Sequence, residues 1–168
     1  HVLRQFSGGA SQILGGLDRH VLGLGDHQRG EVAEAELELA ADGPASRGYP
    51  FRLRPKGQGW IVETGEIIRG VVEDLLAGGA TGEISSRFHR TMAEVVAAGC
   101  EKIRGAGGTT AVALSGGTFQ NMLLLGQVIK LLEGKGFQVY QHRRVPANDG
   151  GLALGQAILA DRTFREEA

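Results

Sequence analysis

In the C-terminal third of the chain, short runs of hydrophobic residues typical of strands alternate with stretches in which hydrophobic residues have helical spacing. Two short apolar runs, at residues 110–114 and 137–141, have the composition of buried strands, and each is followed by apolar residues at helical spacing, at 119–133 and 150–161. The order strand-helix-strand-helix with short loops predicts two parallel strands joined by a right-handed crossover. A glycine-rich turn follows each strand, so both turns are expected at the sheet edge where open α/β sheets bind ligands.

The preceding part of the chain predicts a helical layer with a small β-hairpin. Helices are expected at residues 31–41, 66–76 and 81–104, and paired strands at residues 49–53 and 59–63. Residues 1–30 contain repeated glycines that interrupt helical periodicity, so we expect a divergent, poorly ordered segment with a short helix at best. The fold class predicted from these patterns is α/β, with parallel strands and flanking helices.

Composition narrows the classes of function. The 168 residues suit one domain, or one lobe of a larger protein, and the 42% of hydrophobic residues are enough for a core. A formal net charge of −1 argues against a nucleic-acid or membrane partner, and there is no apolar run of about 18 residues that could cross a bilayer. No secretory signal is recognisable, so a cytoplasmic location is expected. The single cysteine, Cys100, excludes a disulfide framework and a cysteine zinc site, and its helical context predicts a small buried hydrophobic residue.

The first glycine turn is a candidate nucleotide-binding site. Ser115, Gly116 and Gly117 follow the first of the two parallel strands, and Asn121 lies about one helical turn further on. Glycines let a backbone approach a ligand closely, and free N–H groups at a helix start attract an anion. Asn121 could offer its amide to a ribose or a base. The alternative is an ordinary strand-to-helix turn in which Asn121 caps the helix.

The second turn adds a carboxylate on the other side of the expected cleft. In Asn148-Asp149-Gly150-Gly151, the proline two residues upstream stiffens the loop and directs the Asp149 side chain. Asp149 could ligate a metal ion that bridges to a phosphate. It could also cap the helix start, which is the role of most acidic residues at such positions.

The five histidines form no pair with metal-ligand spacing, so the sequence predicts no complete metal site within this chain. His142, with Arg143 and Arg144, follows the second strand and could attract phosphate, or these could be solvated loop charges. His89 is expected on the surface of the long helix or at a contact with another lobe, not as a catalyst.

Two stretches carry a resemblance to a known family. Residues 112–121 (Val-Ala-Leu-Ser-Gly-Gly-Thr-Phe-Gln-Asn) and residues 140–156 closely resemble the C-terminal end of the HypF carbamoyltransferases, which mature NiFe-hydrogenases. Residues 87–94 match the helix that precedes the strand in that family, so the similarity covers residues 64–160. The related tRNA threonylcarbamoyl-transferring enzymes and O-carbamoyltransferases share an actin/Hsp70-like, ribonuclease H-like ATPase fold of two duplicated lobes. The resemblance implies that residues 1–168 form a single domain, most of the second lobe.

The resemblance also implies a reaction. In that family carbamoyl phosphate and ATP give carbamoyl-adenylate, and the lobe pair transfers the carbamoyl group, in HypF to the C-terminal cysteine of its partner HypE. Ser115, Gly116, Gly117 and Asn121 would then contact ATP or carbamoyl-adenylate. Asp149 would ligate a divalent metal, iron or zinc, shared with a missing N-terminal lobe. No catalytic residue is assigned in this chain, and the chain is expected to be inactive alone.

Departures from the family pattern keep other hypotheses open. The paired histidines that supply the family's other metal ligands have no counterpart here, and the two segments that frame the nucleotide are largely altered within residues 7–31. The alternative is a degenerate module of the same fold that binds a nucleotide or a partner without catalysis. A PP-loop ATP pyrophosphatase is a third reading, but its motif needs an Asp-Ser pair that Thr118-Phe119-Gln120 does not supply.

Overall fold

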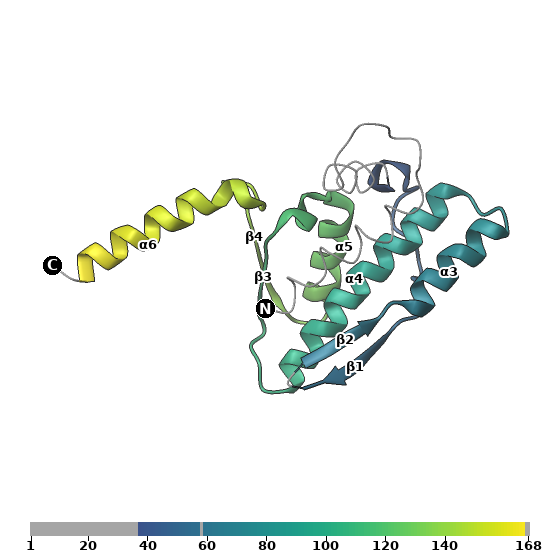
Figure 1. The fold of residues 1–168 in the computed structure, drawn as a ribbon, viewed down its shortest axis with the longest axis horizontal. Coiled ribbons are helices and arrows are strands. Elements are labelled where there is room, and N and C mark those ends of the chain that lie inside the picture. Colours follow the sequence, from purple (N-terminus) through teal and green to yellow (C-terminus); the bar gives the residue numbers. More distant parts are fainter. Residues whose placement is uncertain (1–36, 58, 167–168) are drawn as a thin grey trace.

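Helices α3, α4 and α5 form the body of the molecule, and helix α6 extends away from it (Figure 1). The computed structural model describes residues 37–57 and 59–166, so the predictions for residues 1–30 and for most of the 31–41 helix lie outside the described residues. Residues 37–40 are helical, as expected. The elements are β1 Arg52–Lys56, β2 Gly59–Glu63, α3 Gly65–Leu76, α4 Thr81–Gly105, β3 Ala111–Leu114, η2 Gly117–Gln120, α5 Met122–Gly134, β4 Gln138–Gln141, η3 Asp149–Gly151 and α6 Leu152–Glu166.

The predicted hairpin is present, but its first strand begins three residues later than expected. Strands β1 and β2 pair antiparallel, with Arg52 opposite Glu63 and Lys56 opposite Gly59. Tyr49, expected to open the first strand, is 2% exposed and donates its backbone N–H to Thr91 Oγ1 at 2.7 Å. Its backbone and side chain are therefore used to dock the loop on α4, and the ladder starts only after this contact.

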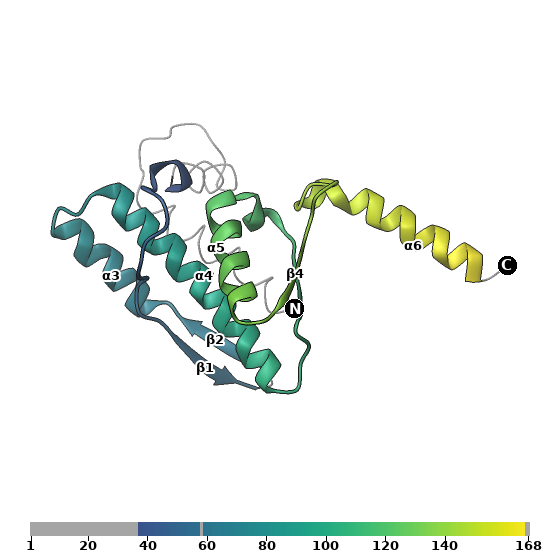
Figure 2. The same cartoon turned by 180° about the vertical axis from the view of Figure 1, so that it is seen from behind.

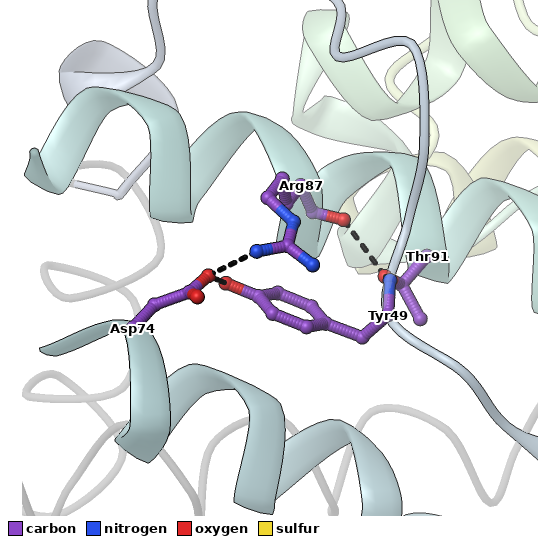
Figure 3. A network of polar contacts seen from close by, with 4 residues as sticks. All are labelled: Tyr49, Asp74, Arg87 and Thr91. Atoms are coloured by element: carbon purple, nitrogen blue, oxygen red, sulfur yellow. Dashed lines mark hydrogen bonds and ion pairs between the residues drawn. The ribbon is translucent and has the colours of Figure 1, made fainter. Parts of the chain in front are cut away.

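A polar network joins that loop to two helices (Figure 3). The Tyr49 phenol donates to Asp74 Oδ2 on α3 at 2.7 Å, and Arg87 on α4 donates to the same oxygen. The Arg87 guanidinium carbon also lies 4.2 Å from the centroid of the Tyr49 ring. On α4, Thr91 Oγ1 donates to the Arg87 carbonyl at 2.7 Å. The network therefore links α3, α4 and the loop that precedes the hairpin.

The main core lies between α4, α5 and the parallel strands. Its aliphatic and aromatic side chains come from widely separated positions, because α4 and α5 pack along much of their length. The buried members are Ala93, Ala97, Leu114, Phe119, Leu124, Leu125, Val128, Leu132 and Phe137. Burial of this apolar surface holds the first turn in place, because it anchors β3 before the turn and η2 and α5 after it.

Strands β3 and β4 are parallel, as predicted, with Ala111 opposite Gln138 and Leu114 opposite Gln141. The mixed α/β class is thereby confirmed. Within the described residues each sheet has two strands, so assignment to an actin/Hsp70-like lobe stays a prediction.

Helix boundaries in the C-terminal third shift from those expected. The predicted helix at 119–133 begins as the short helix η2 and becomes α5 only at Met122, because Asn121 is extended and caps α5. The last helix begins at Leu152 and continues to Glu166.

Helix α6 contacts η3 and lies apart from the body in both views (Figures 1 and 2). Its large apolar side chains are exposed, namely Leu152, Leu154, Ile158, Leu159 and Phe164. Among the described residues no helix combines the length and the apolar character needed to cross a bilayer.

Candidate functional site

The two glycine turns lie against each other at the carboxyl ends of β3 and β4. The Gly116 N–H donates to the Ala147 carbonyl at 2.7 Å, and the His142 Nε2 and Ser115 Oγ atoms are 2.9 Å apart. These contacts confirm that the turns share one edge of the sheet. They follow from the parallel pairing, since parallel strands end at the same edge.

The first turn has a backbone that only glycine adopts readily. Gly116 has φ of +109°, in the region that L side chains rarely adopt. Gly117 has no such restriction, and a Cβ built on it would meet only Gln120 Oε1, 4.0 Å away. The turn therefore has open space over Gly117, as a site for a closely approaching ligand requires.

A groove of about 340 Å³ lies beside the two turns, and its lining includes none of the predicted site residues Ser115, Gly116, Gly117, Asn121 and Asp149. Its lining combines apolar side chains with the polar ends of β4. The lining residues are Leu114, Phe119, Gln120, Met122, Leu125, Gln141, His142, Val145, Pro146 and Ala147. The volume is at the lower end of the range for small-molecule sites.

Asn121 is the N-cap of α5. Its Oδ1 accepts the Leu124 N–H at 2.8 Å, and its carbonyl accepts the Leu125 N–H at 3.0 Å. The capping alternative for Asn121 is therefore what the structure shows. The contact of Asn121 with a nucleotide stays a prediction, and the half-buried side chain lies between the first turn and α4.

The N–H groups at the start of α5, expected to be free for an anion, are already used. Glu38 Oε1 accepts the N–H groups of Met122 at 2.8 Å and Leu123 at 3.2 Å. A carboxylate suits this position because the start of a helix carries partial positive charge. Sequence reasoning missed Glu38 because an alternating Glu/Ala/Leu helix looks the same whether its carboxylates face solvent or another helix.

His89 is buried, so the expected position on the surface of α4 is wrong, whereas the alternative of a contact with another lobe stays a prediction. The distance from His89 Nε2 to Asn121 Nδ2 is 2.8 Å, and the distance from His89 Nδ1 to the Ser85 carbonyl oxygen is 2.9 Å. Burial lowers the pKa of His89 below its ordinary value, although the hydrogen bond to Ser85 and the charge of Glu38 act in the opposite direction. The sequence signal was present, since Ser85 and His89 each follow a residue of the buried stripe and are four apart.

Asp149 begins η3, and its side chain is exposed on the second turn. The side-chain cap there comes from its neighbour, because Asn148 Oδ1 accepts the Gly150 N–H at 3.0 Å. The carboxylate of Asp149 is thus left for another role. Within the part of the chain that the structure describes, no group of three or more His, Cys, Asp or Glu side chains lies close enough to hold a metal ion. Asp149 could therefore supply at most one side chain to a metal site, and its binding of a metal stays a prediction.

Cys100 is half-buried and packs against the main core, as predicted for a structural residue. Burial, and then the charge of Glu101, raise the pKa of its thiol. A raised pKa leaves little thiolate near neutral pH, so Cys100 lacks the character of a nucleophile.

Arg143 and Arg144 are exposed beside the groove.

Comparison with protein families matches residues 20–156 to the family described as "Carbamoyltransferase, Kae1-like Domain, second subdomain". A carbamoyltransferase HypF from Rhodobacter capsulatus is 41% identical over 86 residues, which is 51% of this chain and 11% of that protein. A carbamoyltransferase HypF homolog from Cupriavidus necator is 31% identical over 141 residues, which is 79% of this chain and 36% of that protein.

The fold is also found in solved structures. A full-length HypF crystallised in a phosphate- and nucleotide-bound form superposes with a TM-score of 0.76 and 32% identity, covering 95% of this chain and 20% of that one. The HypF of T. kodakarensis has a TM-score of 0.67 at 23% identity and shows the fold alone. The chain therefore spans only a fraction of the length of the proteins it matches. With a family match over most of its residues, the chain belongs to the HypF carbamoyltransferase family, as the C-terminal lobe of such a protein.

Proposed function

We propose that this chain is the nucleotide-binding half of a carbamoyl-transfer site, in which carbamoyl-adenylate gives its carbamoyl group to the C-terminal cysteine of a HypE-like acceptor in NiFe-hydrogenase maturation. The observation that carries the proposal is the contact between Gly116 and Ala147, which joins the two turns in a chain of this family. The missing lobe, the acceptor and the adenylate are all expected to come from outside these residues.

Charge within the site suggests how a nucleotide would lie. Glu38 fills the positive end of α5 and would repel a phosphate there. A ribose or another hydroxyl-bearing group suits this position, because a carboxylate accepts hydrogen bonds from hydroxyls. The phosphates would then lie towards the open backbone of Gly117 and towards Arg143 and Arg144, which are exposed in the loop between two lining residues of the groove, His142 and Val145.

In this proposal, the metal ion is shared between this chain and the preceding lobe. Asp149 would supply one oxygen ligand, and the other ligands would come from the preceding lobe. A bound divalent metal would act as a Lewis acid on the phosphate and the reacting group. Within this chain, the residues of both turns would bind and orient the adenylate.

The test is nucleotide titration of the chain with Gly117→Ala. A Cβ at this position meets open space in the free protein, so the fold should be retained. The added methyl group would, however, occupy the space through which the ligand would approach the backbone of residue 117. We expect ATP or a non-hydrolysable carbamoyl-adenylate analogue, with the preceding lobe of a HypF added in trans, to bind about tenfold or more weakly, as for loss of a close backbone approach worth ~1.4 kcal/mol.

Gly126→Ala is the matched control, since it adds the same methyl group to an exposed position of α5 with open space around it. Equal nucleotide affinity in wild type, Gly117→Ala and Gly126→Ala would place the ligand elsewhere. If wild-type chain with the preceding lobe bound no nucleotide at all, the proposed function would be wrong, and a degenerate interaction module would be the remaining reading.

A further inference from the structure

The hydrogen bonds that run from Leu124 through Asn121 and His89 to Ser85 allow one arrangement of protons. A backbone N–H can only donate, so the Asn121 atom 2.8 Å from the Leu124 nitrogen must be Oδ1. The amide nitrogen of Asn121 then faces His89 Nε2 at 2.8 Å. Because an amide nitrogen only donates, Nε2 must be the unprotonated acceptor.

The other ring nitrogen completes the arrangement. His89 Nδ1 lies 2.9 Å from the Ser85 carbonyl oxygen, which can only accept, so Nδ1 carries the proton. Ser85 Oγ is a second neighbour of Nδ1 at 3.3 Å, but it donates to the Leu37 carbonyl. The chain of bonds is therefore satisfied only by a neutral ring with its proton on Nδ1.

A proton on Nε2 would break this chain at its centre. Two donors, the Nε2–H and the Asn121 Nδ2–H, would then face each other at a distance suited to a hydrogen bond. Asn121 could relieve the clash by exchanging its amide oxygen and nitrogen, but the Leu124 N–H would then lose its acceptor. Either way, protonation of His89 is coupled to the cap of α5.

The cap is connected to the first turn. The Asn121 N–H bonds to the Thr118 carbonyl at 3.4 Å, and the Phe119 N–H bonds to the Gly116 carbonyl at 3.0 Å. Asn121 is thus the residue at which η2 ends and α5 begins. Asn121 therefore connects the first glycine turn, through η2, to the start of α5.

Within the described residues, the groups that face the His89 ring come from three segments. His89 is 4% exposed, with Ser85 on its own helix, Asn121 at the start of α5, and Glu38 on the 37–40 segment as the charged group that acts on it. The neighbouring cations of α4 are engaged elsewhere, Arg87 with Asp74 and Arg90 with Glu94. Glu38 favours the charged ring, whereas the amide of Asn121 and the burial favour the neutral one.

We propose that His89 is a positioning residue for the first glycine turn, whose neutral ring fixes the Asn121 amide and holds the turn in its binding-competent form. The ligand of that turn rests on the proposed function, but the coupling of His89 to Asn121 is a property of the free chain. Protonation of the ring releases the cap, so nucleotide affinity should fall as the pH falls through the titration of His89.

The test measures the titration of His89 by NMR in the full chain without ligand. Asn121→Asp keeps an oxygen for the Leu124 N–H and places a carboxylate oxygen where Nδ2 faced the ring. If Nε2 lies against residue 121 as described, the titration midpoint of His89 rises by about one to three pH units. Asn148→Asp is the matched control, because it makes the same change at the cap of the second turn, where the partner is the Gly150 N–H.

An equal change of the His89 midpoint in Asn121→Asp and Asn148→Asp, or no rise in Asn121→Asp, would overturn the proposal. This comparison tests the proposal even if the wild-type His89 ring stays neutral until the protein unfolds in acid. The carboxylate of Asn121→Asp would raise the titration midpoint of His89 into the pH range in which the protein is folded.

His89→Gln supplies a second, independent variant. The Gln Oε1 atom can take the place of Nε2 as acceptor without titrating, so the cap should be retained and the amide shifts of Leu124 and Phe119 should not titrate between about pH 5 and 8. If these amides titrate in His89→Gln as in wild type, the ring does not control the turn. Neither titration contains a nucleotide, so a failed Gly117→Ala test and a failed His89 test are separate results.

Discussion

Tyr49 and Asp74 are joined by a hydrogen bond of 2.7 Å from the phenol to Oδ2, and the same oxygen receives the Arg87 guanidinium (Figure 3). The bond connects the loop before β1 to the third turn of α3, while Arg87 stacks on the phenol ring from α4. Gly70 lies directly beneath the ring, where a Cβ would come within 2.5 Å of Tyr49 Cδ1. Tyr49 therefore contributes to the position of α3 on the body, together with the Arg87–Asp74 ion pair and the buried side chain of Ile67.

Tyr49→Phe should destabilise the chain by about 1–2 kcal/mol, the cost of leaving Asp74 without one donor while the ring still fills its site. The free energy of unfolding from urea denaturation measures this. Tyr140→Phe is the control, because the Tyr140 side chain is 53% exposed and its hydroxyl can be solvated by water in either state. Equal stability of both variants would contradict the role assigned to the Tyr49 phenol.

Alkaline stability should also depend on Tyr49. Burial, and then the hydrogen bond to Asp74 and its charge, raise the pKa of the Tyr49 phenol above its ordinary value. The unfolded phenol ionises near pH ~10, while the folded phenol stays protonated, so the folded state binds more protons above that pH and stability falls as the pH rises. Wild type should therefore lose more unfolding free energy between about pH 9 and 11 than Tyr49→Phe. Parallel curves for the two proteins would show that the buried phenol does not contribute.

Gly116→Ala should destabilise the first turn by about 1–2 kcal/mol, because an alanine is strained at φ of +109° even though the space around it is open. Gly126→Ala adds the same methyl group within α5, and should instead stabilise the chain by up to about 1 kcal/mol. Thermal unfolding of the two variants against wild type makes the comparison. A stable Gly116→Ala variant would mean that the turn can adopt another backbone.

Removal of α6 should leave the rest of the chain as stable as before. The helix contacts η3, and its side chains contribute no member to the buried core of the described residues. A chain ending at Gly151 should therefore unfold at the same urea concentration, by far-UV circular dichroism, as the full chain. A clear loss of stability would show that the apolar face of α6 packs on the body in solution.

The local elements were largely predictable, because each is encoded in a short stretch of sequence. The parallel pair β3 and β4, the hairpin and the long helix α4 appear where apolar spacing placed them, with no end shifted by more than three residues. The largest shift among these elements, at β1, arises because Tyr49 contacts Thr91 and Asp74, residues distant in sequence. No spacing rule within residues 49–53 could reveal that contact.

The candidate site likewise has features that the sequence predicted and features that it did not. Glycine at positions 116 and 117, an asparagine at the helix start and an aspartate in the second turn are local features, and the sequence alone placed both turns at one edge of a parallel sheet. What those residues bind was indicated by resemblance, and the family is now confirmed by the match over residues 20–156. Nucleotide and metal binding by Ser115, Gly116, Gly117, Asn121 and Asp149 remain predictions.

By itself, then, the sequence determined the elements, their order and the meeting of the two turns, since strand and helix periods and chain connectivity are local properties. Only the tertiary structure decided that Glu38 closes the positive end of α5 and that His89 is buried against Asn121. Both contacts depend on packing between segments 32 or more residues apart. A polar side chain on a helix faces solvent or a partner according to what packs against it, and that is not a property of the helix alone.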